Sequence, residues 1–178
     1  LERIEIPSSV KKMGKWAFSQ CSNLKEVMLS ESLEEIKYGT FLKCKSITSL
    51  AFPPSIKIIE QGAVAECTSL QQVLLPEQLE IIGESVFESD TALEEIIFPD
   101  DSKFTIGKEA FKECESLKTL TLPLGVKKID HEAFVDCFEL TSVTLYDTTK
   151  YYDDSFENKV KLTILDGNKF KGIGNPIG

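Results

Sequence analysis

The hydrophobic residues of the chain recur in short blocks, in which aliphatic positions are separated first by two residues and then by one. Leu70, Val73 and Leu75 form such a block, and the last two alternate with Gln72 and Leu74. Alternation at period 2 is typical of a strand with one buried face. Proline often follows the block and, because it cannot donate a ladder hydrogen bond, it ends the strand. We therefore predict one short strand in each block.

Two further apolar features follow each predicted strand. An aliphatic pair, such as Val126 and Ile129, comes after the proline and predicts a second short strand. A compact Ala-Phe-x-x-Cys segment, seen as Ala110, Phe111 and Cys114, then closes the unit. This segment is too short for a full helix, so we expect a single helical or 3₁₀ turn.

The complete unit recurs every 23 residues, and the cysteines show the period most clearly: Cys21, Cys44, Cys67, Cys114 and Cys137. Asp90 occupies the slot of the missing cysteine, and Val64 replaces one phenylalanine. A repeat of this length indicates a solenoid, in which each unit forms one coil and buries its apolar face by stacking on its neighbours. Equivalent strands are expected to be parallel neighbours about 4.7–4.9 Å apart.

The repeats predict one domain over residues 1–165, with a partial first repeat and about six full ones. Residues 166–178 are rich in glycine, and we interpret them as a capping tail or linker. Since residues 1–13 match the second half of a repeat, we interpret the chain as a fragment of a longer array. Its first strand would then present an edge open to edge-to-edge pairing with another molecule.

The unit resembles the BspA-type leucine-rich repeat. The cleanest copy runs from Glu109 through Leu117 and Pro123 to Ile129. The chain departs from the pattern at Val64, Asp90 and Lys159 and in one inserted residue near positions 100–104. The resemblance implies a curved, right-handed solenoid of the α/β type, rich in parallel strands. It also implies a location at the cell surface or outside the cell, and adhesion to host or extracellular matrix proteins.

Charge and hydropathy exclude several classes of partner. The formal net charge is −9 and the isoelectric point is about 4.8. Nucleic acids and anionic lipid surfaces attract basic proteins, so neither is an expected partner. The sequence has no run of about 18 apolar residues, and we predict no insertion into a membrane.

The cysteines at one repeat position predict a column of buried free thiols that act as small hydrophobic side chains. A disulfide between neighbouring coils is the alternative, because stacked cysteines come close enough for one. Ligands in a straight column do not surround an ion tetrahedrally, so we predict no metal. No cofactor motif is present either, because the glycines at 172 and 174 do not follow a predicted strand.

The sequence favours a non-enzymatic protein. His131 is the only histidine, and we interpret it as a solvated turn residue between Asp130 and Glu132. No serine or cysteine shows a nucleophile signature with a histidine partner. Asp90 is expected to accept hydrogen bonds from turn amides. The alternative at Asp90 is a locally opened coil that forms a binding notch.

The outward positions of the first strands predict a partner-binding surface. Met28, Ala51, Leu74 and Ile97 align in one column on a face expected to meet water, and Gln72 and Glu95 stand in the polar column beside it. A contiguous apolar patch on a soluble surface usually marks an interface. The alternative is that these side chains are partly covered or simply tolerated. Trp16 is a further candidate anchor, or else it covers what a missing repeat would have covered.

These observations predict a module that binds a protein ligand through its first sheet. A structural spacer that presents another domain, with no partner of its own, is the alternative. A spacer should have polar columns throughout, so the apolar column favours binding.

Overall fold

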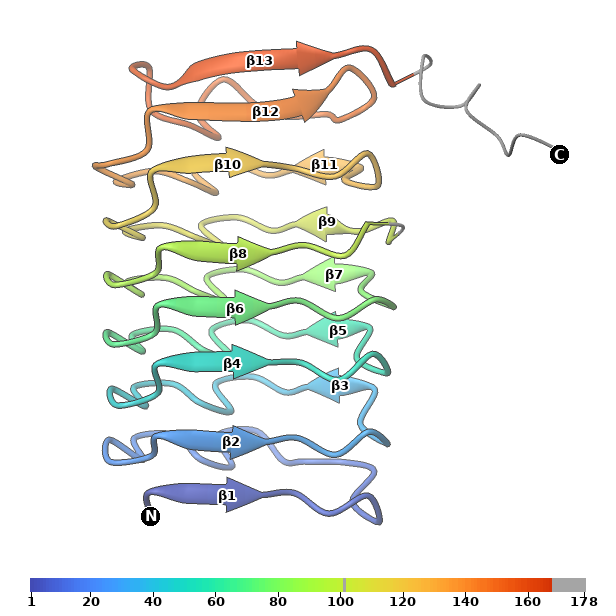
Figure 1. Cartoon of the computed structure of the whole chain (residues 1–178), viewed down its shortest axis with the longest axis vertical. Coiled ribbons are helices and arrows are strands. Elements are labelled where there is room, and N and C mark those ends of the chain that lie inside the picture. Colours follow the sequence, from blue (N-terminus) through green and yellow to red (C-terminus); the bar gives the residue numbers. More distant parts are fainter. Residues whose placement is uncertain (101, 168–178) are drawn as a thin grey trace, which may run out of the picture.

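The computed structural model describes residues 1–100 and 102–167, and these residues form a stack of parallel coils (Figure 1). The predicted tail over 166–178 lies outside the described residues from position 168 onward. Within the described residues no helix is long and apolar enough to cross a membrane. The strands are β1 (Arg3–Glu5), β2 (Glu26–Met28), β3 (Glu35–Ile36), β4 (Ser49–Ala51), β5 (Ile58–Ile59), β6 (Gln72–Leu74), β7 (Ile81–Ile82), β8 (Glu95–Ile97), β9 (Thr105–Ile106), β10 (Thr119–Thr121), β11 (Lys128–Ile129), β12 (Ser142–Tyr146) and β13 (Lys161–Leu165).

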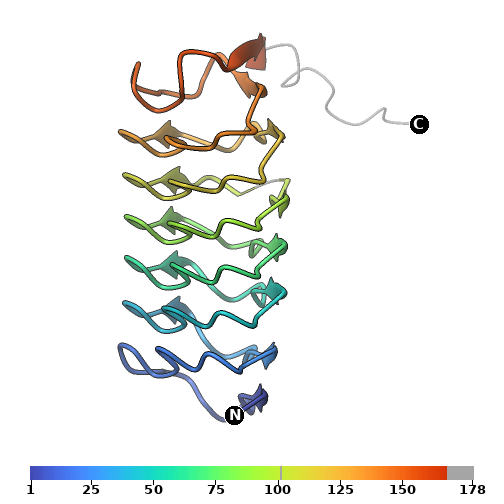
Figure 2. The same cartoon turned by 90° about the vertical axis from the view of Figure 1, so that its left-hand side faces the viewer.

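Two sheets run along the stack on opposite sides of the coils. The first contains the parallel sets β1-β2, β4-β6-β8 and β10-β12-β13, and the second has the order β11-β9-β7-β5-β3. In Figure 1 the first sheet runs from left to right in front and the second runs back behind it as the chain rises, so the coil is right-handed. The coils lie in near-parallel layers with little curvature, unlike the curved array that the family resemblance implies (Figure 2).

The register of the first sheet confirms the 23-residue repeat. Ala51 pairs with Leu74, and Leu74 pairs with Ile97, so each strand residue lies beside its equivalent in the next coil. In the partial first repeat, Val10 and Met13 hold the positions of the second aliphatic pair, but they form no second strand, and β3 is the edge of its sheet. In the described part of the chain, the first coil therefore lacks the second strand that β3, β5, β7, β9 and β11 provide in the coils that follow.

The Ala-Phe-x-x-Cys segments fold as consecutive turns and not as the expected helical or 3₁₀ turn. Bonds of the 3₁₀ type do form, as from the Cys21 amide to the Phe18 carbonyl at 3.1 Å. However, the residues directly before the column position, such as Gln20 (φ 62°), adopt the left-handed conformation, as do those five before it, such as Glu109 (φ 54°). Alternate amides therefore point along the stack, and the Phe18 amide donates to the Thr40 carbonyl of the next coil at 2.9 Å. These turns add a third hydrogen-bonded side to the solenoid.

The core is a set of columns in which equivalent side chains stack from coil to coil. The phenylalanine column is continuous through Phe87, Phe111, Phe134 and Phe156, with ring centroids 5.0–5.3 Å apart and nearly parallel planes. Val64 interrupts this column, and Phe41 on the other side stacks on Phe18 at 5.7 Å. Stacking across coils is what makes one coil depend on the next.

Asp90 is fully buried in the cysteine column. Its Oδ1 accepts a hydrogen bond from the Cys67 amide at 2.8 Å, whereas Oδ2 has no partner among the described residues. Burial raises the pKa of the Asp90 carboxyl well above its ordinary value, the charge of Glu66 adds to this, and the Cys67 amide opposes it. The expected hydrogen bond from the backbone is therefore present, but it comes from a single amide of the preceding coil. The alternative of a coil that opens at Asp90 is not seen, because the side chain is fully buried.

The cysteines are free, and four of them are buried, as predicted. Each buried thiol donates to a carbonyl of the preceding coil, as Cys67 Sγ does to Phe41 at 3.2 Å. Burial raises the pKa of Cys44 and of Cys137 to about 12. Cys21 is half-buried and is the accessible member of the column.

We expect the native protein to present about one reactive thiol of its five cysteines at pH 8, because a thiol that is buried and protonated does not attack a disulfide reagent. Titration with Ellman's reagent, with and without urea, measures the two counts. Cys21→Ser should abolish the native reaction and leave four thiols in urea. Rapid native reaction of the Cys21→Ser variant would contradict the buried column.

Candidate partner-binding surface

The candidate surface is built on the outward face of the first sheet. Side chains of successive strand residues point to opposite faces, so Val73 enters the core while Gln72 and Leu74 face outward. The three-residue strands of the first sheet repeat this arrangement, with exposed outer residues and a more buried middle one. We call the column formed by Met28, Ala51, Leu74 and Ile97 the apolar stripe.

The stripe is exposed to solvent. Met28 is 48% exposed, Leu74 42% and Ile97 38%, and Ala51 is also exposed. Each of these three side chains is therefore partly covered by its neighbours and partly open to water. Large aliphatic side chains aligned on consecutive coils form a continuous apolar surface, and single scattered ones would not.

Polar groups border the stripe on both sides. On one side stand Glu26, Ser49, Gln72 and Glu95, and the Gln72 amide donates to the Glu95 carboxylate. On the other side, in the turns and bend that follow the strands, lie the exposed carboxylates of Glu31, Glu77 and Asp100. We call these three residues the acidic rim. Gln72 and Glu95 thus stand beside the stripe, as predicted from the sequence.

Two surface hollows lie between the stripe and the acidic rim. One, of about 290 Å³, is bounded by Met28, Ala51, Glu31 and Pro54 among others. The other, of about 560 Å³, is bounded by Leu74, Glu77, Phe98 and Asp100 among others. The surface is therefore grooved along the side on which its carboxylates gather.

Trp16 does not lie with the stripe, because it belongs to the turn segments and not to the first sheet. Its side chain is 54% exposed, and its ring meets the Tyr38 ring edge-on at a centroid distance of 5.1 Å. A Cβ at Gly39 would come within 2.6 Å of the ring, so only glycine leaves room for the indole there. Trp16 therefore caps the turn of the following coil, and any binding role for it would be separate from the stripe.

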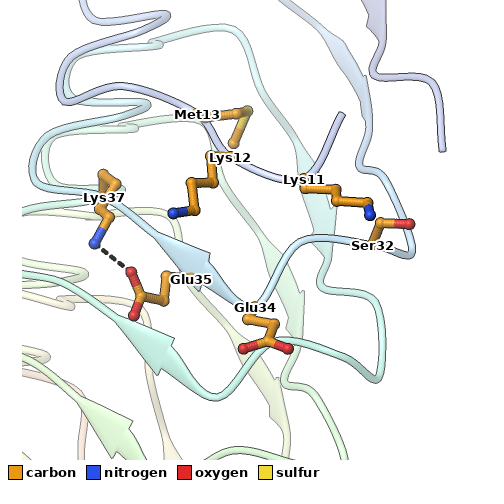
Figure 3. Close-up of a pocket in the computed structure, with 7 residues that line it drawn as sticks. All are labelled: Lys11, Lys12, Met13, Ser32, Glu34, Glu35 and Lys37. Carbon is orange, nitrogen blue, oxygen red and sulfur yellow. Dashed lines mark ion pairs between the residues drawn. The ribbon is translucent and has the colours of Figure 1, made fainter. Parts of the chain in front are cut away.

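A hollow of about 410 Å³ lies beside β3, where the first coil lacks a second strand (Figure 3). Lys11 and Lys12 enter it from one side, and Lys37 is paired with Glu35 and, at 2.9 Å, with Glu60. Basic and acidic groups alternate around this hollow, and the Lys37 charge is neutralised locally. We therefore do not choose it as the partner-binding surface.

His131 belongs to a cluster of side chains from the last coils. Its Nδ1 lies 2.9 Å from the Asp154 carboxylate, and its ring stacks on Tyr152 at a centroid distance of 3.7 Å. Burial raises the pKa of Asp130, but hydrogen bonds from Lys128 and the His131 amide outweigh it, so that pKa lies below its ordinary value. His131 is exposed, as predicted, but it is held by these contacts instead of being freely solvated. These contacts tie adjacent coils together.

The described residues contain no group of three or more His, Cys, Asp or Glu side chains placed to hold a metal ion. The stacked architecture explains this arrangement. Each column offers side chains along a line, and a line of ligands does not enclose an ion.

Comparison with known proteins agrees with this architecture. The model of the BspA type leucine rich repeat region matches six copies over residues 1–105 and 90–175. A leucine-rich repeat protein from Eubacterium ventriosum ATCC 27560 is 22% identical with a TM-score of 0.80, over 91% of this chain and 44% of that one. A search of curated proteins gives no match.

Two further solved structures share the fold. The leucine rich repeat protein of T. pallidum is 23% identical with a TM-score of 0.74, over 98% of this chain and 84% of that one. A leucine rich cell surface protein of Faecalibacterium prausnitzii A2-165 is 19% identical with a TM-score of 0.54, over 100% of this chain and 64% of that one. The chain thus spans less than two thirds of the length of two of the three proteins compared.

Proposed function

Because this chain belongs to the BspA type leucine rich repeat family, whose repeats are generally protein-interaction modules, we propose that it is a non-enzymatic module that binds a protein ligand. We further propose that it acts at the cell surface or outside the cell, in adhesion to a host or extracellular matrix protein. The description of one structural relative as a cell surface protein supports this location.

The observation that carries the proposal is the apolar stripe. Four aligned residues with exposed side chains leave apolar area in contact with water, and a partner that covers this area gains about 25 cal/mol for each Å². The coils below are tied by backbone hydrogen bonds and stacked rings, so the surface is preformed. A rigid surface loses little conformational entropy on binding. The spacer alternative has no comparable use for such a surface.

We expect Leu74→Glu combined with Ile97→Lys to weaken binding to the partner by at least about tenfold, because central apolar contacts carry most interface energy. The partner is identified by a surface plasmon resonance screen of purified extracellular matrix proteins. The melting temperature should change little, since both side chains are exposed.

Thr119→Lys combined with Thr121→Glu is the matched control. Both threonines are exposed and face outward on β10, beyond the stripe, and the pair introduces the same charges. Binding should be retained in this variant. If the stripe variant binds as tightly as the wild type, the stripe is not the site. If no matrix protein binds at micromolar concentrations of the module, the spacer becomes the better account.

A further inference from the structure

The spacing of the stripe restricts the shape of a partner that can follow it. Hydrogen-bonded parallel strands lie about 4.7–4.9 Å apart, and β4, β6 and β8 form one such set, so the stripe presents one side chain about every 4.8 Å from Ala51 to Ile97. A ligand segment that contacts all four coils must repeat its own apolar side chains at nearly that interval.

An α-helix meets this requirement better than an extended strand. The apolar positions on one face of a helix recur about every 3.6 residues, which is about 5.4 Å along its axis. The residues on one face of a strand recur about every 6.6–6.8 Å. Over the two steps from Ala51 to Ile97, a helix therefore drifts by about 1 Å, whereas a strand drifts by about 4 Å, most of one coil spacing.

The charged side chains around the stripe indicate which charge that helix should carry. The three carboxylates of the acidic rim have no Lys or Arg within ion-pair distance in the described part of the chain. On the other side, Glu26 is paired with Arg3 at 3.5 Å, and Glu95 accepts from Gln72. These three carboxylates thus stand next to the two hollows without an ion pair, although Lys103 and Lys127 share further hollows with Glu77 and Asp100.

Arg3 is a basic residue in direct contact with the stripe. Its Nη2 lies 3.4 Å from Met28 Sδ at the β2 end. Basic groups of a partner are therefore best accommodated over Ala51, Leu74 and Ile97, beside Glu77 and Asp100. A helix that contacts the stripe over four coils needs about 10–12 residues at a rise of 1.5 Å each.

Taking the proposed binding function as its premise, we propose that the ligand element recognised by the stripe is a basic amphipathic α-helix. The helix lies along the stack, with its aliphatic face on Met28, Ala51, Leu74 and Ile97. Lysines or arginines on its flank face the acidic rim. Electrostatic attraction at such a rim raises the association rate and makes binding sensitive to salt.

Three synthetic peptides labelled with a fluorophore test the inference. The helical probe is an 18-residue peptide of Leu, Ala and Lys with leucines at positions i, i+4, i+7 and i+11. The strand probe has the same composition with leucine at alternate positions, and the acidic probe is the helical one with Glu in place of Lys. Fluorescence anisotropy measures binding, and circular dichroism measures the helix gained.

We expect the helical probe to bind and to gain helicity, and the strand and acidic probes to bind at least about tenfold more weakly. Leu74→Gln with Ile97→Gln should weaken the helical probe about tenfold without a change of charge. Glu31→Gln with Glu77→Gln should weaken it about threefold and reduce its salt dependence. Glu84→Gln with Glu115→Gln, which removes two exposed carboxylates elsewhere, is the matched control and should have little effect.

Equal binding of the helical and strand probes, or binding of the helical probe that survives the Leu74 and Ile97 substitutions, would overturn the inference. If a matrix protein binds through Leu74 and Ile97 but the helical probe does not bind, the helix is wrong and the proposed function stands. If neither ligand binds, both fail. The inference is supported if the helical probe binds, loses affinity on substitution of Leu74 and Ile97, and binds more tightly than the strand probe.

Discussion

Replacing Phe111 with alanine is expected to lower the free energy of unfolding by about 3–5 kcal/mol, the usual cost of removing a buried aromatic side chain. Phe111 is fully buried, and its ring stacks on Phe87 at 5.0 Å and on Phe134 at 5.1 Å. The variant loses both stacking contacts and leaves a cavity in the middle of the column. Because each coil is stabilised mainly by its neighbours, the loss also weakens two coil interfaces. Urea denaturation followed by circular dichroism measures it.

Two matched variants show whether the column is responsible. Phe138→Ala makes the same substitution at a ring that is 59% exposed, and it should cost less than about 1 kcal/mol. Phe41 is as buried as Phe111 but has one stacked partner, since Val64 follows it in the column. Phe41→Ala should therefore cost less than Phe111→Ala by about 0.5–1.5 kcal/mol, the value of one aromatic pair. Equal losses for Phe111 and Phe138 would contradict this account of the core.

The inward columns could be predicted from the sequence because every coil meets the same physical requirement. Leu70, Val73 and Leu75 must all reach the core, and the alternation of the strand then sends Leu74 outward. The 23-residue period places that outward residue beside Leu74's equivalents Ala51 and Ile97. The position of the stripe thus follows from period and alternation alone.

The turn segments could not be predicted in the same way. Their fold depends on left-handed backbone positions, and most of the residues at these positions are of types that give no sign of that conformation. Gly39 and Gly62 are the visible sign of a left-handed position. At the equivalent position, Trp16, Glu109 and Glu132 adopt the same conformation without being glycine. Tertiary hydrogen bonds between coils hold these residues there against their intrinsic preference. The acidic rim was not predicted from the sequence for a related reason. Its carboxylates belong to the turns and bend after the strands, and the path of these segments places them beside the stripe.

The two main departures from the repeat, Val64 and Asp90, stand at two positions that are hydrogen-bonded to each other in the preceding pair of coils. In the preceding pair of coils, the Cys67 thiol donates to the Phe41 carbonyl. One coil further on, the same two positions are held by Asp90 and Val64. Asp90 Oδ1 accepts a hydrogen bond from the Cys67 amide. A neutral carboxyl can also donate, as the thiol does, whereas a carboxylate cannot.

The burial of Asp90 is expected to make the protein less stable as pH rises. In the unfolded chain this carboxyl loses its proton near the ordinary pKa of about 3.9. In the folded chain burial raises the pKa well above that value, so the native state holds a proton that the unfolded state has released. The free energy of unfolding should therefore fall between these two pKa values by up to about 1.4 kcal/mol for each pH unit. Below the unfolded pKa the group contributes no slope, and above the folded pKa the loss is complete.

Asp90→Asn and Asp90→Cys remove this titration and keep a side chain of similar size. Each variant should be more stable than the wild type at pH 8, and its advantage should shrink towards pH 5. Glu60 and Glu109 have pKa values below the ordinary value, so they make the free energy of unfolding rise with pH. This contribution is the same in the variant and the wild type, and it cancels in the difference between them. Urea titrations at several pH values, followed through Trp16 fluorescence, provide that difference. If the variant and the wild type lose stability in parallel from pH 5 to pH 8, Asp90 is already ionised in the fold, and its carboxylate must be satisfied by a group other than the Cys67 amide.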